Sequence, residues 1–199
     1  MDSTLINEEA IDLLAESAGV GEQVAQITER AMAGELDFHS ALRNRVALLA
    51  DQEVSILADV RGRLTFTPGL QELIVGLRAR SIRFGVVSGG FHEIIDPILD
   101  DLGLDFVRAN RFKVASKRLT GEVCDPIIGA EEKAKALEDF AANFDIPLNE
   151  TVAVGDGAND REMLKRAGLG ISFCGKPALK EIADISIEKR DLSLILDHI

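Results

Sequence analysis

The chain has 199 residues, of which 46% are apolar and 28% are charged, and this composition is typical of a folded globular protein rather than a disordered one. Domains usually contain ~100 to 200 residues, so the length suits one complete domain with a modest insertion. The 34 acidic residues outnumber the 22 basic ones, and the net charge of −12 argues against a surface that binds nucleic acid. A bound phosphate group would therefore need a local positive site.

The two cysteines and the N-terminal residues indicate in which compartment the protein is expected. Cys124 and Cys174 lie far apart without a C-x-x-C pattern, which favours neither a disulfide framework nor a zinc site, so we expect reduced thiols in the core. The chain has no signal-peptide pattern at its start and no apolar run near the ~18 residues that span a bilayer. We expect a cytoplasmic protein that does not bind membranes.

The first third of the chain is predicted to be a run of helices without a strand. Over residues 7–59 apolar residues recur at helical spacing, as in Leu42, Val46 and Leu49, and glycines near residues 19–21 and 34 mark the joints. A helical insertion that precedes every recognisable strand is unusual. This module therefore needs a strand before it.

Strands and helices alternate in the remainder of the chain. The predicted elements are a helix at residues 70–80, a strand at 82–88, a helix from 92, a hairpin at the sheet margin within 106–123, a helix at 130–143, a strand at 151–155, a helix from 159 and a strand at 169–173. This order predicts a parallel sheet with helices on both faces. Ligands of such a sheet bind outside the carboxyl ends of the strands.

Three short segments carry groups that could hold a phosphate. D-S-T at residues 2–4 would by itself be interpreted as a solvated helix cap. S-G-G at residues 88–90 places a hydroxyl and bare backbone amides where an apolar strand meets a helix, which suits phosphate oxygens, although a plain turn would look the same. Lys133 lies on a predicted helix, where most lysines are surface residues.

The strongest motif is G-D-G-A-N-D at residues 155–160. Asp156 and Asp160 follow an apolar strand and are separated by glycine, alanine and asparagine. Two carboxylates at a strand end supply the hard oxygen ligands that magnesium prefers. An acidic helix cap would explain one of these aspartates but not the whole pattern.

Together, the four motifs occur in the order found in the haloacid dehalogenase superfamily, and the chain resembles its phosphoserine phosphatases over its whole length. The local matches are N-E-E at residues 7–9, L-R-N-R-V-A-L-L at 42–49, S-G-G-F at 88–91 and G-D-G-A-N-D at 155–160. The resemblance implies an α/β fold with a doubly wound, Rossmann-like parallel sheet, whose core comprises residues 1–6 and 66–199. Residues 7–65 would form a small helical cap that determines specificity.

The family's chemistry implies roles for the matching residues. Asp2 is expected to protonate the departing serine oxygen and then to activate the hydrolytic water. The backbone carbonyl of Asp2 and the carboxylate of Asp156 would bind Mg2+, with Asp160 as a further ligand or as a residue that orients the others. The residues expected to bind the substrate or to neutralise its phosphate are Ser88, Gly89, Lys133 and Asn159.

The family's nucleophile is the first aspartate of D-x-D-S-T, a position that would precede Met1. We therefore expect that aspartate, and the central strand that carries it, immediately upstream of residue 1, so that the printed chain would be a truncation or have a misplaced start. By this interpretation Asp2 is the general acid and base rather than the nucleophile.

Two charged residues of the helical module indicate the substrate. Arg45 shares an apolar helix face with Leu42 and Leu49, where its guanidinium needs an anion such as a substrate carboxylate, unless its stem packs on the core and its head reaches water. The resemblance assigns Glu9 to the substrate ammonium, whereas simple helix-dipole complementation is the alternative. Met32 and Phe38 could surround the bound serine, but we interpret both as core residues.

The resulting hypothesis is a magnesium-dependent phosphoserine phosphatase that hydrolyses O-phospho-L-serine to L-serine and phosphate, the last step of serine biosynthesis. One alternative is a protein that binds phosphoserine or another anion without hydrolysing it. Another is a phosphatase or phosphotransferase for a different small phosphomonoester, such as phosphohomoserine. The sequence leaves the choice between a monomer and a homodimer open.

Overall fold

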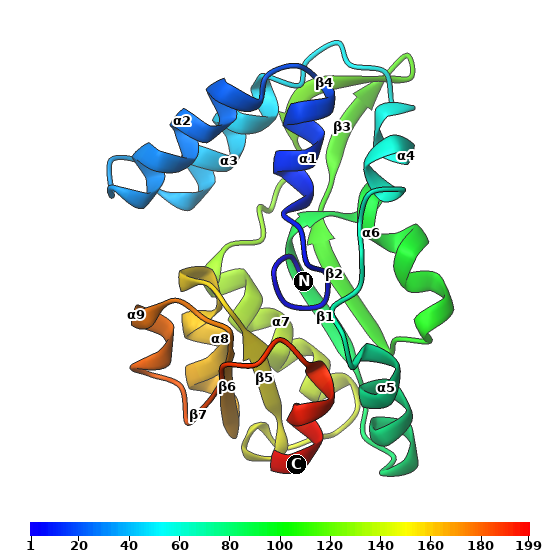
Figure 1. Cartoon of the computed structure of the whole chain (residues 1–199), viewed down its shortest axis with the longest axis vertical. Coiled ribbons are helices and arrows are strands. Elements are labelled where there is room, and N and C mark those ends of the chain that lie inside the picture. The colour runs from blue at the N-terminus through cyan, green and yellow to red at the C-terminus, as the bar shows by residue number, and fades with distance from the viewer.

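The computed structural model describes residues 1–199 and has two layers, which lie one above the other in Figure 1. The upper layer begins with four helices, as the helical spacing predicts. They are α1 Ala10–Ser17, α2 Gly21–Met32, α3 Phe38–Ala47 and α4 Ile56–Arg61. Asp37 caps α3 by accepting a hydrogen bond from the Ser40 backbone N–H at 2.9 Å, which fixes where this helix starts.

The lower layer contains the parallel strands, in two separate groups. Strand β1 Gly85–Phe91 pairs with β2 Phe106–Asn110, and a second sheet contains β5 Val152–Gly155, β6 Leu169–Phe173 and β7 Ile185–Ile187 in that order. Every pairing in both groups is parallel, which confirms the predicted fold class. No ladder joins β1 to β5, so each of these strands has one free edge.

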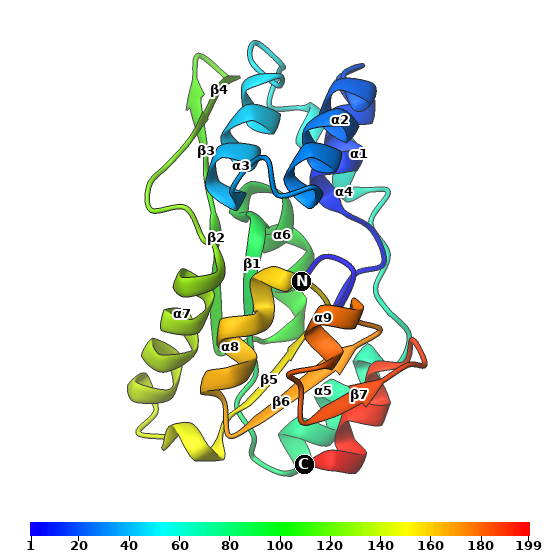
Figure 2. The ribbon, with the colours of Figure 1, turned by 90° about the vertical axis from the view of Figure 1, so that its left-hand side faces the viewer.

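Helices cover both faces of these sheets (Figure 2). They are α5 Leu70–Ala79, α6 His92–Leu99, α7 Ala130–Asn143, α8 Arg161–Arg166 and α9 Pro177–Lys180, with short 3-10 helices at Asp100–Leu102, Leu148–Glu150, Ala158–Asp160 and Leu192–His198. Helix α8 packs on β5 and β6, whereas α5 packs on the C-terminal 3-10 helix. The sequence prediction missed β7 and this last helix.

The predicted hairpin at residues 106–123 is wrong in both extent and position. Residues 106–110 form β2 of the parallel sheet, and only β3 Phe112–Ala115 and β4 Arg118–Val123 form an antiparallel hairpin. This hairpin lies in the upper layer, where Leu119 exchanges backbone hydrogen bonds with Asp51 and Gln52. Alternation of apolar residues indicates a strand but not its partner, so the sequence could not place the hairpin. The division into a cap at residues 7–65 and a core stays a prediction.

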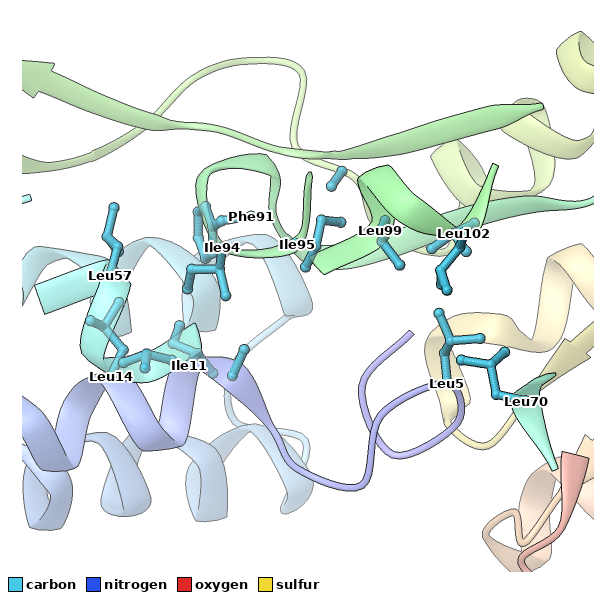
Figure 3. Close-up of a cluster of buried hydrophobic side chains, with 14 of the residues drawn as sticks. Leu5, Ile11, Leu14, Leu57, Leu70, Phe91, Ile94, Ile95, Leu99 and Leu102 are labelled. Atoms are coloured by element: carbon cyan, nitrogen blue, oxygen red, sulfur yellow. The ribbon is translucent and has the colours of Figure 1, made fainter. Parts of the chain in front are cut away.

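One hydrophobic cluster joins the two layers (Figure 3). Ile94 and Ile95 of α6 are completely buried, with Leu14 of α1 and Leu57 of α4 on one side and Leu5 toward the other. Burying one large aliphatic side chain contributes about 1.5 to 3 kcal/mol, so α6 fixes the position of the upper helices over the sheet.

We expect Leu14→Ala to lower the free energy of unfolding by about 2 to 5 kcal/mol, because it opens a cavity where the layers meet. The matched control is Val75→Ala on α5, whose side chain is 65% exposed and which should change stability by less than about 0.5 kcal/mol. Urea unfolding followed by circular dichroism measures both. Equal effects of the two substitutions would contradict the shared core.

No helix combines the length and the apolar character needed to cross a bilayer. Cys124 and Cys174 are both free cysteines. Each is only partly buried; Cys174 packs against the main hydrophobic cluster, whereas Cys124 is not part of it.

Candidate active site

The candidate site lies where the N-terminal loop meets the carboxyl ends of β1 and β5. Residues 1–6 form a tight loop in which the Met1 carbonyl accepts hydrogen bonds from the backbone N–H groups of Leu5 at 2.8 Å and Ile6 at 3.1 Å. The loop lies near the centre of the molecule in Figure 1, between α1 and the strands. It presents the predicted residue Asp2 to the sheet.

Asp2 connects the predicted D-S-T and S-G-G segments. One carboxylate oxygen accepts a 3.5 Å hydrogen bond from the Ser88 hydroxyl, and the other accepts a 3.3 Å bond from the backbone N–H of Ala10, the first residue of α1. The buried Ser88 hydroxyl also accepts a bond from the Gly90 N–H at 2.9 Å. Residues separated by more than 80 positions therefore meet at one carboxylate, as the motif order implies.

Lys133 and Asp160 form the most deeply buried ion pair of the molecule, with a distance of 2.7 Å and side-chain exposures of 5% and 7%. The second oxygen of Asp160 accepts backbone N–H bonds from Asp156 at 3.1 Å and Gly157 at 3.0 Å. Burial acts to raise the pKa of Asp160, but the charge of Lys133 and these bonds outweigh it and lower the pKa. Asp160 therefore shapes the loop, and both its oxygens already have partners.

Gly155 is required by the closeness of the Asp160 carboxylate. A β-carbon at residue 155 would collide with the carboxyl group of Asp160. The first glycine of G-D-G-A-N-D thus lets a buried aspartate approach the end of β5, which explains this part of the motif physically.

The arrangement of Asp156 and Asp2 fits a magnesium ion. Thr4 donates a 2.8 Å hydrogen bond to one Asp156 oxygen, whereas the other oxygen and the backbone carbonyl of Asp2 receive none from the protein. Burial raises the pKa of Asp156, as expected of a carboxylate whose charge is incompletely compensated. No group of three or more acidic, histidine or cysteine side chains is placed to hold an ion. The chain thus offers one or two oxygens, and magnesium commonly takes its other ligands from water and phosphate.

Two supporting residues were missed by the sequence analysis. Asn110, buried at the end of β2, donates to the Gly89 carbonyl at 2.8 Å and accepts from the Ile128 N–H at 2.7 Å, which holds the S-G-G turn. Arg190 donates two bonds, at 3.0 and 2.9 Å, to the Ser3 carbonyl and anchors the loop that carries Asp2. Neither residue belongs to a motif, and both act across long sequence separations, so no local signal could identify them.

The upper layer brings Glu9 and Arg45 to the same place. Arg45 forms no ion pair within 4 Å, although the charges of Asp12, Glu9 and Asp2 all act on it, and burial lowers its pKa. Glu9 accepts a 2.8 Å bond from the Ser3 hydroxyl. Glu9 is exposed to solvent, but the protein around its carboxyl group partly removes water from it; this desolvation, together with the charge of Asp2, raises the pKa of Glu9 to about 6.

Helix α3 also touches the S-G-G turn. The tip of the Phe38 ring lies 3.1 Å, and the Asn159 side-chain nitrogen 3.7 Å, from the point where a β-carbon on Gly89 would stand. Phe38 is partly buried against the main hydrophobic cluster, in agreement with its interpretation as a core residue, and it also borders the S-G-G turn. Met32, by contrast, is 71% exposed, so its interpretation as a core residue is wrong.

Comparison with known proteins agrees with these observations. The model of the haloacid dehalogenase-like hydrolases matches residues 1–165. The chain belongs to this hydrolase family. In this chain the Ser88 hydroxyl contacts Asp2, and the buried Lys133 pairs with Asp160 of the β5 loop.

Relatives within this hydrolase family narrow the comparison. The chain is 50% identical to the phosphoserine phosphatase SerB2 of Mycobacterium tuberculosis and spans about half (48%) of that protein's length. It is 47% identical to a phosphoserine phosphatase of Streptococcus thermophilus, covering 99% of this chain and 92% of the relative. A solved structure described as a phospho-aspartyl intermediate analogue of phosphoserine phosphatase superposes with a TM-score of 0.94 at 48% identity, over 100% of this chain and 95% of the other.

We expect Lys133→Met to lower the free energy of unfolding by about 3 to 5 kcal/mol, because Asp160 would become a buried, uncompensated charge. Lys135→Met is the matched control on the same helix, since its side chain is 70% exposed and its ion pair with Asp139 spans 3.6 Å. Equilibrium urea unfolding compares them. A loss at Lys133 no larger than that at Lys135 would contradict the structural importance of the buried pair.

Proposed function

We propose that this chain is a phosphoserine phosphatase, which hydrolyses O-phospho-L-serine to L-serine and phosphate with Mg2+ in the cytoplasm. The observation that carries the proposal is the position of Glu9 and Arg45, two opposite charges that face Asp2 without pairing with each other. A free amino acid carries one ammonium and one carboxylate, which are opposite in charge to Glu9 and Arg45 respectively. The two phosphoserine phosphatases at 50% and 47% identity support the same substrate.

Recognition of the serine moiety follows from the charges of the upper layer. The guanidinium of Arg45 lacks an ion-pair partner and would bind the substrate carboxylate, because an arginine fork matches that group's geometry. The carboxylate of Glu9 would accept the substrate ammonium. Phe38 would close the apolar side of the pocket next to Gly89.

Binding of the phosphate uses the lower layer. The Ser88 hydroxyl and the backbone amide of Gly89 would donate to phosphoryl oxygens at the end of β1, near Asn159. Lys133 has three N–H donors, of which Asp160 uses one, so a further N–H can act on the phosphate. The carboxylate of Asp156 and the carbonyl of Asp2 would help to hold Mg2+, which would supply positive charge to the phosphoryl oxygens.

The proton transfers belong to Asp2. A carboxylate nucleophile would attack phosphorus in line, and the bond from phosphorus to the serine oxygen would break as Asp2 gives its proton to that oxygen. Asp2 would then take a proton from water as the water attacks phosphorus of the resulting aspartyl-phosphate, and the bond from phosphorus to the carboxylate oxygen would break, which releases phosphate and the free carboxylate. The similarity to a phospho-aspartyl intermediate analogue supports this sequence of steps.

A binding comparison tests the assignment of Arg45. We expect Arg45→Met to weaken phosphoserine binding about 10- to 100-fold, because a charge-assisted hydrogen bond contributes about 1.5 to 3 kcal/mol. Phosphoethanolamine lacks the carboxylate, so its affinity should not change. Arg43→Met, which alters an exposed arginine of the same helix paired with Asp125, is the control. Titration calorimetry with magnesium measures the affinity of each variant for phosphoserine and for phosphoethanolamine. An equal loss of affinity for both ligands in Arg45→Met would contradict the proposal.

The pKa of Glu9, about 6, predicts a pH dependence of phosphoserine binding. Above pH 6 the carboxylate is charged and binds the substrate ammonium; as the pH falls through 6 it is protonated and this attraction is lost. The dissociation constant should therefore rise between pH 7 and pH 5. In Glu9→Gln the dissociation constant should rise less over the same pH range, as measured by the same calorimetry. Identical profiles for the two proteins would contradict the role of Glu9.

A further inference from the structure

The S-G-G turn is a bulge in strand β1. The pairing of β1 with β2 is regular up to Val87 and Arg108 and resumes at Phe91 and Asn110. All three residues of the turn therefore lie opposite one residue of β2, Ala109. Because a bulge interrupts the regular ladder, the backbone groups beside it need hydrogen-bond partners from outside the two strands.

The first turn of helix α6 supplies such partners to β2. The Nε2 atom of His92 accepts a hydrogen bond from the Ala109 backbone N–H at 3.0 Å, and a carboxylate oxygen of Glu93 accepts one from the Phe112 N–H at 3.2 Å. Asn110 lies in the short stretch of β2 between these two bonded positions. The helix that follows the S-G-G turn thus holds the strand on which that turn rests.

The contacts of His92 identify the form of its ring. A backbone N–H can only donate, so Nε2 accepts and carries no proton. The proton of the neutral imidazole is then on Nδ1, which lies 2.7 Å from a carboxylate oxygen of Asp96 and donates to it. The side chain is only 13% exposed, so water has little access to replace either bond.

A short series of contacts leads from β2 to the hydroxyl of Ser88. The Asn110 side chain donates to the Gly89 carbonyl at 2.8 Å, which fixes the peptide group between Gly89 and Gly90. The N–H at the other end of this peptide group donates to the Ser88 oxygen at 2.9 Å. With its oxygen held in this way, the Ser88 hydroxyl keeps its own hydrogen for another acceptor.

We propose that His92 is a positioning residue for the phosphate site, because its neutral ring holds Ala109 and thereby the orientation of Asn110 and of the S-G-G turn. His92 itself does not touch the substrate in this account. The part of the proposal that concerns phosphate rests on the proposed function, whereas the effect of His92 on the shape of the turn does not.

Charged groups near the ring come from three elements besides β1, which has none. Asp96 of α6 and Asp100 of the following 3-10 helix line the same hollow as the ring, together with apolar residues and a glycine. The only charged residue of β2, Arg108, is paired with an aspartate of α7. Helix α4 brings Arg61 to the backbone carbonyl of Glu93.

NMR of the isotopically labelled chain without ligand tests the contact. A coupling between the Ala109 nitrogen and the Nε2 of His92, transmitted across the hydrogen bond, is expected while the ring is neutral. Protonation would put a hydrogen on Nε2, so the coupling should vanish as the ring's own nitrogen shifts report protonation. The amide signals of Asn110 and Gly90 should shift in the same titration. Absence of the coupling, or amide signals that ignore the titration of the ring, would overturn the proposal.

Two substitutions test the consequence for binding. His92→Leu removes the acceptor, and we expect it to weaken phosphoserine about 3- to 10-fold with magnesium present, the effect of losing one hydrogen bond. His92→Gln offers a carbonyl oxygen that accepts without being protonated, so it should stay within about 2-fold of the unsubstituted chain. L-serine lacks the phosphate, and its affinity should change in neither variant. His198→Leu, at an exposed histidine of the last 3-10 helix, is the matched control.

The outcomes separate positioning from general damage and from failure of the proposed function. Equal losses of phosphoserine and L-serine affinity in His92→Leu, or no loss of either, would overturn the proposal, as would a glutamine variant as weak as the leucine variant. If the unsubstituted chain binds neither ligand, the proposed function fails. The NMR titration of the free chain then decides whether His92 holds the S-G-G turn, and it also decides this if His92→Leu does not fold.

Discussion

The buried ion pair between Lys133 and Asp160 is the interaction on which the site depends. An ammonium removed from water is costly unless a carboxylate compensates it, and here the carboxylate lies 2.7 Å away. Its other oxygen binds the amides of Asp156 and Gly157, which determines the path of the chain after β5. The loop therefore holds the Asp156 carboxylate toward the N-terminal loop, where Thr4 reaches it.

The contacts that begin at the β5 loop continue through the N-terminal loop into the upper layer. The loop bound through Thr4 carries Asp2, which lies between Ser88 and the first N–H of α1. Glu9 precedes that helix and shares Ser3 with the loop. Packing of α1 and α4 on the buried face of α6 then keeps these charged groups over the strand ends (Figure 3).

Much of this arrangement could be predicted from the sequence, because its signals are local. Helical spacing identified α1 to α3, and the apolar runs with glycines after them identified β1, β5 and β6. The motifs also named the carboxylates and the lysine that the structure brings together. The hairpin was placed wrongly because strand patterns do not specify partners. Asn110 and Arg190 were missed because each acts on a residue distant in sequence, Arg190 on Ser3 across 187 positions.

The central claim is that the N-terminal loop, the S-G-G turn and the β5 loop form one site for an amino-acid phosphomonoester. Amide chemical shifts of the isotopically labelled chain, recorded by NMR while phosphoserine is added with magnesium, test it most directly. The account predicts large shifts for Ser3, Gly89 and Gly157 together, and none for Gly34 or Gly121 in the upper layer. Shifts confined to one of the three segments, or absent from all of them, would contradict it.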